Sequence, residues 1–360
     1  MSMTALDNPG VRELAQSLDA LRRRGALTLL ALGLATLVAL VLSVALGPVE
    51  VPLGDVLLHV LAMVGLPTDA PEASAPFVTL RLQRALLGLG VGASLGLAGA
   101  VLQGLFKNPL ADPGLIGVSS GARLGATAFI VLGGGALVTT PLAAVILLPA
   151  AAFVGAVLTM LAVRRLASRA GQTHIALLLL AGLAVTVFEE AAVGLLTALA
   201  DDEALRSVTL WRLGSLGGAT WPVVWVVVGV TATGALLLMR QARSLDALLI
   251  GEREAGHLGV RTERLKRELV FVSALIVATA TAFVGIIGFI GLVVPHLVRL
   301  LAGPTHKVLL PGAMLCGALL VLVADLLART LAAPSELPVG VVTAFIGAPF
   351  FLWLVARRRA

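Results

Sequence analysis

Residues 85–106 read ALLGLGVGASLGLAGAVLQGLF, a run without a single charged residue. As an α-helix, such a run is long enough to cross a hydrocarbon core about 30 Å thick. Similar runs recur along the 360-residue chain, which is 59% hydrophobic and only 13% charged, whereas soluble domains are about 25% charged. The runs show no period-2 alternation, so they favour helices over the strands of a membrane barrel. The sequence therefore predicts an all-α fold, a polytopic transmembrane helical bundle.

The apolar windows predict about ten transmembrane helices. We expect them near residues 26–46, 85–106, 115–133, 141–163, 175–199, 222–239, 267–287, 289–302, 308–328 and 338–356. Basic residues gather in alternate loops and near both ends of the chain, at 22–24, 107, 164–169, 240–267, 307 and 357–359. Because basic loops stay in the cytoplasm, both termini are expected on that side. Residues 1–25 would then form a cytoplasmic segment, and residues 26–360 the transmembrane domain.

Glycines punctuate the first of these runs at a helical spacing. Gly88, Gly92 and Gly96 follow one another every fourth residue, and Gly99 continues the series. Residues three or four apart share one face of a helix. Small residues on such a face let membrane helices approach closely, so we expect tight packing there.

The composition also excludes several kinds of site. The single cysteine, Cys316, rules out a disulfide framework and a cysteine-based metal cluster. Loop arginines explain the net charge of +6, so no nucleic-acid partner is expected. No P-loop, HExxH or GxSxG motif occurs. The chain is therefore not expected to be an enzyme, to hydrolyse ATP by itself or to carry a cofactor.

Three of the charged residues inside predicted spans call for a partner on another span. Arg123 lies within the third span, and Glu189 and Glu190 lie near the middle of the fifth. Charges at such depth usually face a bundle interior, a water-filled cavity or an opposite charge. We expect Arg123 to pair with Glu189 or Glu190, unless the spans end earlier and the side chains reach an interface. Asp325 and Arg329, four residues apart, should form an ion pair within one helix.

Three arginines depart from the charge pattern, because they stand at the outer ends of spans. Arg81 and Arg84 lie on one face at the start of the second span, and Arg329 ends the ninth. One interpretation is that their side chains snorkel to the interface. The other is that these external cations dock a negatively charged soluble partner, since charges steer and register such an encounter.

The longest cytoplasmic loop reads SLDALLIGEREAGHLGVRTERLKRE, residues 244–268. Its glycines separate two short amphipathic pieces in which leucines alternate with charged residues. A connection between two spans needs far fewer residues. We therefore interpret this segment as a docking surface, with a solvated loop as the alternative.

A second cytoplasmic element is QGLFKNPLADPG, residues 103–114. Pro109 and Pro113 bias Asn108 and Asp112 away from helical conformation. Asp112 is also a good cap for a helix that starts near Pro113. The segment is expected to be a rigid turn at the inner mouth of the bundle rather than a substrate site.

Three long segments resemble one known family. They are RLQRALLGLGVGASLGLAGAVLQGLFKNPLADPGLIGVSSGA (81–122), GIIGFIGLVVPHLVRLLAG (285–303) and ADLLARTLAAPSELPVGVVTAFIGAPFFLWL (324–354). They are similar to the permease subunits of bacterial type II ABC importers (FecCD-type), which import iron-siderophores, haem and vitamin B12. The chain departs from the family's commoner pattern at Gln83, where proline is more usual, at Arg123, where alanine is frequent, and in GIIGF, where GPIGF is commoner.

The resemblance implies a homodimer in the bacterial inner membrane, served by two cytoplasmic ATPase subunits and a periplasmic binding protein. It implies that Arg81, Arg84 and Arg329 dock the binding protein. It also implies that the ATPase receives a coupling element formed by Leu249, Gly251, Glu252, Ala255, Gly256, Leu258, Gly259 and Val260.

Within that family, the chain is most similar to haem permeases, so haem is the expected substrate. Arg206 and Arg212, which flank Trp211 near the outer mouth, could meet haem propionates; an interfacial aromatic belt is the alternative. A ferric siderophore or vitamin B12 is the alternative substrate. From a different class, an ion-coupled secondary transporter would use Arg123, Glu189 and Glu190 as a proton relay.

Overall fold

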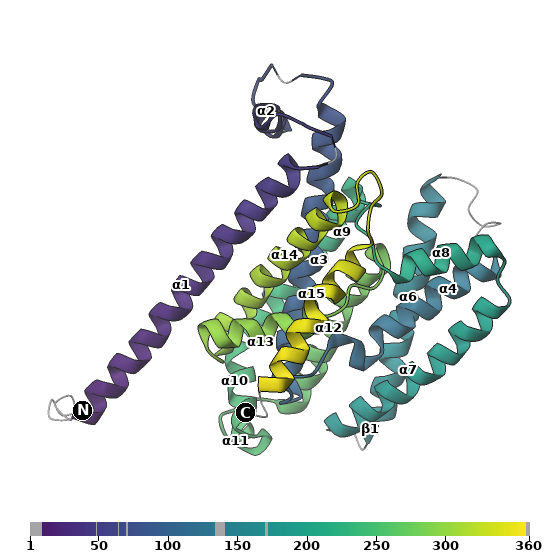
Figure 1. Cartoon of the computed structure of the whole chain (residues 1–360). Helices are drawn as coiled ribbons and strands as arrows, with labels where there is room; N and C mark the ends of the chain where they lie inside the picture. The colour runs from purple at the N-terminus through teal and green to yellow at the C-terminus, as the bar shows by residue number, and fades with distance from the viewer. Residues whose placement is uncertain are drawn as a thin grey trace.

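The computed structural model describes residues 9–47, 49–63, 65–69, 71–133, 141–169 and 172–357, and its architecture is helical throughout (Figure 1). The long helices are α1 (Pro9–Ala45), α3 (Ala75–Leu105), α4 (Val118–Leu132), α6 (Pro141–Ala167), α7 (Ile175–Ala198), α9 (Trp221–Arg240), α12 (Thr262–Val284), α13 (Ile290–Ala302), α14 (His306–Thr330) and α15 (Val339–Arg357). The short elements are α2 (Leu53–Met63), the 3-10 turn η2 (Pro113–Ile116), β1 (Ser168–Arg169), β2 (Gln172–Thr173), α8 (Asp202–Arg212), α10 (Ala242–Ile250) and α11 (Glu252–His257).

Each of the predicted spans coincides with one apolar helix. Seven helices within the described residues are long and apolar enough to cross a membrane. The other three, α4, α13 and α15, are shorter apolar helices at the predicted positions. The predicted helical bundle is therefore confirmed. Its largest boundary error is at α1, which begins at Pro9 rather than near residue 26, and α3 likewise begins at Ala75 rather than near residue 85.

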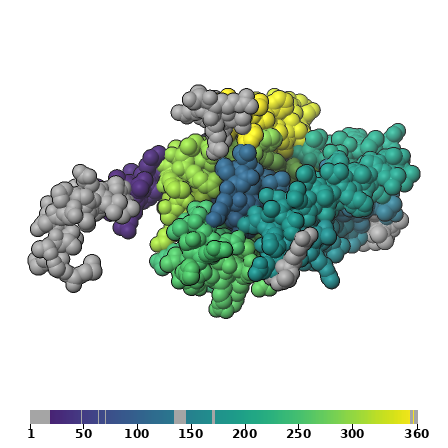
Figure 2. All heavy atoms as spheres, turned by 90° about the horizontal axis from the view of Figure 1, so that it is seen from below, coloured from purple at the N-terminus to yellow at the C-terminus, as the bar shows by residue number. Residues whose placement is uncertain are grey.

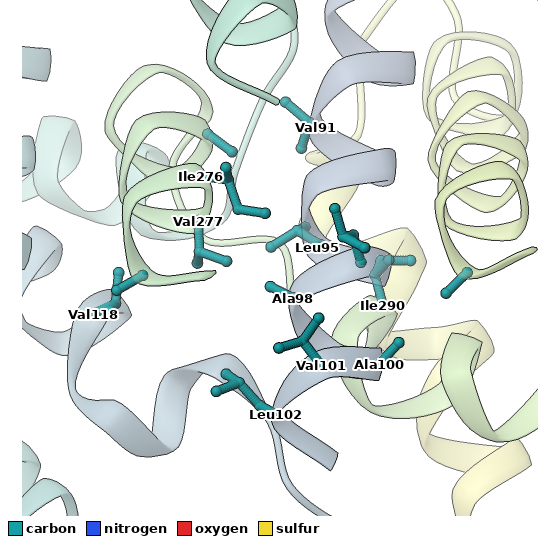
Figure 3. Packing of buried hydrophobic residues seen from close by; sticks show 14 of the residues in the cluster. Val91, Leu95, Ala98, Ala100, Val101, Leu102, Val118, Ile276, Val277 and Ile290 are labelled. Carbon is teal, nitrogen blue, oxygen red and sulfur yellow. The ribbon is translucent and has the colours of Figure 1, made fainter. Parts of the chain in front are cut away.

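Helix α3 is the centre of the bundle (Figure 1) and contacts α14, α12, α13 and α9. Its glycines explain how these neighbours come so close. A Cβ atom added at Gly92, Gly96 or Gly99 would overlap the backbone of α14 or α13. Figure 3 shows the apolar side of the same contacts, with Val91 and Leu95 of α3 packed near Ile276 of α12.

The loops contain short helices that the apolar windows did not predict. Helices α2 and α8 lie in the two long outer loops. Asp201 caps the start of α8, because its side chain accepts a hydrogen bond of 2.8 Å from the backbone N–H of Ala204.

The long cytoplasmic loop folds into the two amphipathic pieces predicted for it, α10 and α11, separated by Gly251. These helices lie at the same end of the bundle as the start of α1 and the end of α15 (Figure 1). Figure 2 views that end and shows the segment (green) at the surface.

Candidate functional site

Two of the three outer arginines contact one buried carboxylate. Asp325 of α14 is completely buried, and its Oδ1 accepts a 2.8 Å hydrogen bond from Nε of Arg84 on α3. Its Oδ2 lies 3.1 Å from Nε of Arg329, one turn along α14, which is the predicted ion pair. Arg84 also reaches Glu336, at 2.7 Å from Nη1 to Oε2, and Glu336 is half exposed. Two arginines and two carboxylates thus tie α3, α14 and the loop before α15 together.

The other contacts of these arginines reach the end of α1. Arg81 donates to the carbonyl oxygen of Ala45 at 2.9 Å, and Arg329 donates to both the carbonyl and the hydroxyl of Ser43 at 3.0 Å. Within this subunit all three guanidinium groups are therefore buried and have partners in their own chain. Their predicted docking to a partner protein is not tested by this arrangement and stays a prediction.

The intramembrane charges form a second cluster. Arg123 of α4 forms an ion pair with Glu190 of α7, while Glu189 accepts a hydrogen bond from the hydroxyl of Thr159. The structure thus selects Glu190 from the two predicted partners. Arg212, at the end of α8, brings Nη2 to 4.0 Å from Glu190, so Glu190 lies between two arginines.

Trp211 and Arg206, the other residues predicted near the outer mouth, lie in different surroundings. Trp211 is half-buried and packs against the hydrophobic core. Arg206 is exposed on α8, and within the described residues it forms no ion pair. The structure therefore brings Arg212, but not Arg206, to the intramembrane charges.

Exchanging the charges of this pair tests it directly. Arg123→Glu places two carboxylates side by side inside the membrane, so transport and folded yield should fall by about 10-fold or more. Adding Glu190→Arg restores the opposite charges and should recover most of the loss, whereas Glu189→Arg should not. Uptake and detergent-purified yield of the three variants are the measurements. Equal rescue by both partners would contradict the assignment.

The coupling segment is held by one buried lysine. Nζ of Lys266 on α12 lies 2.8 Å from Oε2 of Glu252 and 2.7 Å from Oε1 of Glu263, and it donates to the carbonyl of Thr173 at 3.2 Å. This residue fixes the start of α11 to α12 and to β2. Local sequence patterns do not predict this role of Lys266, although Glu263, three residues earlier on the same helix, is a visible signal.

The same segment is fixed a second time through α10. His306, at the start of α14, places Nδ1 2.7 Å from Oδ1 of Asp246, which also accepts the backbone N–H of His306 at 3.0 Å. Leu245 and Leu248, on α10 itself, are buried. Helix α10 is therefore joined to α14 by a hydrogen-bonded, packed contact.

The predicted coupling residues divide into an anchored and an exposed set. Ala255 is fully buried, Gly251 separates α10 from α11, and Glu252 takes the Lys266 ion pair. By contrast, 40% of Leu249 and 67% of Leu258 are exposed on the cytoplasmic face. Exposed leucines beside charged residues are what a docking surface requires.

The end of that segment forms a hollow. Leu258, Gly259 and Val260 line a polar groove of about 380 Å³ together with Arg261 and Glu268. Gly259 adopts a φ of +83°, which a residue with a Cβ rarely adopts, so this turn requires its glycine. Gly256 lies one turn earlier, in open space.

The inner-mouth turn is built by its own side chains. Asn108 accepts a 3.0 Å hydrogen bond from the N–H of Leu110, and Asp112 accepts one of 2.8 Å from the N–H of Gly114. Asp112 therefore caps the following turn as predicted. Burial raises the pKa of Asp112, while the hydrogen bond from Gly114 lowers it. Both bends of the turn therefore have an internal hydrogen-bond partner.

One expectation for this turn needs correction. The helix after Pro113 is a single 3-10 turn, η2, which ends at Gly117 with φ of +81°, and α4 begins only at Val118. A Cβ atom added at Gly291 would lie 2.6 Å from Cδ of Pro113, so the turn packs against the start of α13. Pro109 lies in the same turn. Within the described residues no group of three His, Cys, Asp or Glu side chains could hold a metal ion.

Comparison with known proteins assigns the family. The FecCD transport family matches residues 35–357. The chain is 46% identical over 283 residues to the hemin transport system permease protein HmuU of Yersinia pestis, covering 79% of this chain and 84% of the relative. It is 44% identical over 289 residues to the cobalamin import system permease protein BtuC of Halobacterium salinarum, covering 80% and 75%.

A solved structure shares the fold. The inward-facing conformation of a putative metal-chelate type ABC transporter superimposes with a TM-score of 0.79 at 32% identity, covering 91% of this chain and 98% of that one. The helices, the outer arginine cluster and the anchored cytoplasmic segment therefore belong to a multi-pass membrane permease. The chain is a member of the FecCD transport family and has the architecture of the translocating subunit of an ABC transporter.

Proposed function

We propose that this chain is the translocating subunit of an ATP-driven importer that carries haem from a periplasmic binding protein into the cytoplasm. It would act as a homodimer in the bacterial inner membrane, with two separate ATPase subunits that hydrolyse the ATP. The observation that carries the proposal is the cytoplasmic segment, which is anchored through Lys266 and His306 and exposes Leu249 and Leu258. A self-contained carrier needs no such surface.

The anchoring supports a mechanical role for this segment. ATPase subunits that close on ATP would push α10 and α11. Because Asp246 binds His306 and Glu252 binds Lys266, the displacement would pass to α14 and α12. Both helices contact α3 at the centre of the bundle. Interfaces of this kind convert a small shift into a rearrangement of packed helices.

At the outer end, we propose that Arg81, Arg84 and Arg329 contribute to docking of the binding protein. Arg84 is already paired with the half-exposed Glu336. A carboxylate of the binding protein would then compete with Glu336 for Arg84. Exposed charge contacts weaken with salt. Affinity for the binding protein that is the same at low and high ionic strength would exclude this role.

Haem is the favoured substrate because of the similarity to a hemin permease, and Arg212 offers a cation for its propionates near Glu190. Cobalamin is the second candidate, because a cobalamin permease is nearly as similar. The test is uptake into proteoliposomes that contain the chain, its ATPase and its binding protein. We expect ATP-dependent uptake of haem that exceeds uptake of cobalamin and of a ferric siderophore by about 10-fold or more. Uptake of cobalamin without haem would correct the substrate and leave the importer role intact.

A further inference from the structure

An apolar groove runs along one side of the bundle. Its outer part, about 450 Å³, lies between α6, α9 and α12, and it is lined by residues such as Ile146, Phe153, Val226 and Leu275. A second hollow of about 240 Å³ continues between α6 and α12, where Phe153 and Leu275 line both. The second hollow exposes no polar surface. An apolar groove at membrane depth will take up hydrocarbon rather than water.

The groove leads to two arginines at the end of the bundle that carries the basic loops. Met160 of α6 and Phe271 of α12 line its inner part. One turn further on the same faces lie Arg164, four residues after Met160, and Arg267, four residues before Phe271. Arg164 and Arg165 line an open hollow of about 660 Å³ at this end.

These arginines keep positive charge available. Within the described residues Arg164 has no ion-pair partner, and Nε of Arg267 donates only to the backbone carbonyl of Glu263 on its own helix, at 3.3 Å. The carboxylate of Glu263 lies 2.7 Å from Nζ of Lys266 but shares that lysine with Glu252, so Arg267 is the second cation beside these two carboxylates. At the mouth of the groove Arg164 therefore has no carboxylate partner among the described residues, while Arg267 keeps an exposed guanidinium group beside Glu263.

The length of the groove fits one leaflet of a bilayer. At 1.5 Å per residue, the path along α6 from Phe153 to Arg164 covers about 16 Å. This is about half of a hydrocarbon core of about 30 Å. A chain that starts at the level of Arg164 would end near Phe153, where the inner hollow meets the outer one.

We propose that this groove binds one anionic phospholipid, with an acyl chain between α6 and α12 and its phosphate between Arg164 and Arg267. Basic side chains at the cytoplasmic end of a groove between membrane helices are suited to anionic head groups. The apolar lining, the unpaired Arg164 with the exposed Arg267 beside it, and the leaflet-length spacing all favour a lipid over a protein side chain. The proposal does not depend on the transported substrate.

Native mass spectrometry of the delipidated, detergent-purified chain tests the proposal. Dioleoyl phosphatidylglycerol should bind more tightly than dioleoyl phosphatidylcholine, and inorganic phosphate should not displace it. At about 5-fold per arginine, Arg164→Gln with Arg267→Gln should weaken phosphatidylglycerol binding by about 25-fold. Val157→Phe, which fills the inner hollow, should lower the occupancy even with both arginines present.

Matched variants separate the site from general effects. Arg22→Gln with Arg23→Gln removes two exposed arginines of α1, and Val154→Phe enlarges an exposed side chain of α6, the helix that carries Val157; both variants should bind lipid as the unmodified chain does. Unchanged binding in the double arginine variant, equal affinity for the two lipids or full displacement by phosphate would overturn the proposal. A groove that binds no lipid and becomes protected when two chains associate would assign this face to a second copy instead.

Discussion

Replacing Asp325 with alanine is expected to destabilise the protein by about 3–5 kcal/mol, because it leaves a buried positive charge without its counter-charge. Asp325 is completely buried between Arg84 and Arg329. Arg84 would retain only the half-exposed Glu336, and Arg329 would retain only uncharged oxygens, those of Ser43 and Leu46. Thermal unfolding of the detergent-purified chain should show a markedly lower midpoint.

Glu336→Gln is the matched control, since it removes a carboxylate from the same arginine at a half-exposed position. Exposed ion pairs contribute only about 0–1 kcal/mol, so this variant should unfold almost as the unmodified chain does. Equal destabilisation by the two substitutions would show that the cluster is not organised around Asp325.

Replacing Gly99 with leucine is expected to have the second large effect, because it would separate α3 from α13. A Cβ atom at this position would overlap the backbone carbonyl of Gly291, which cannot move as a side-chain end can. Overpacking of a core typically costs about 1–3 kcal/mol, and a clash with backbone should reach or exceed the upper value. Folded yield and unfolding midpoint should both fall.

Gly229→Leu on α9 provides the comparison, since nothing lies within 4 Å of a Cβ atom added there. It changes the same residue type within another apolar helix, so it should leave yield and midpoint nearly unchanged. A Gly99 variant that behaves like the Gly229 variant would contradict the close approach of α3 and α13.

The helices were predictable because membrane spans are set by local composition. Each apolar window became a helix, and the glycine spacing of α3 marked its tightest contacts. The predicted start of a helix was wrong where a polar segment, such as the beginning of α3, was itself helical. Charges at Arg81 and Arg84 led it to start α3 too late, since local hydropathy cannot show that Asp325, far along the chain, neutralises Arg84.

The sequence predicted which residues form the candidate sites, but not which residues they contact. Depth in the membrane implied a counter-charge for Arg123, yet the rotation of α7 about its axis decides between Glu189 and Glu190. Likewise, the amphipathic pattern indicated two short cytoplasmic helices, while their anchors, Lys266 and His306, depend on the packing of distant helices. Residue spacing shows what shares a face, whereas long-range contacts depend on the assembled bundle.

The most direct test of the proposed importer is the energy source of haem uptake in proteoliposomes that hold the chain, its ATPase and its binding protein. The account predicts that uptake requires the binding protein and ATP on the side of the membrane where the ATPase subunits lie. Uptake should also continue when ionophores collapse the proton and sodium gradients. An ion-coupled carrier that uses Arg123, Glu189 and Glu190 as a relay would behave in the opposite way. Uptake that continues without ATP and stops when the ion gradients collapse would contradict the account.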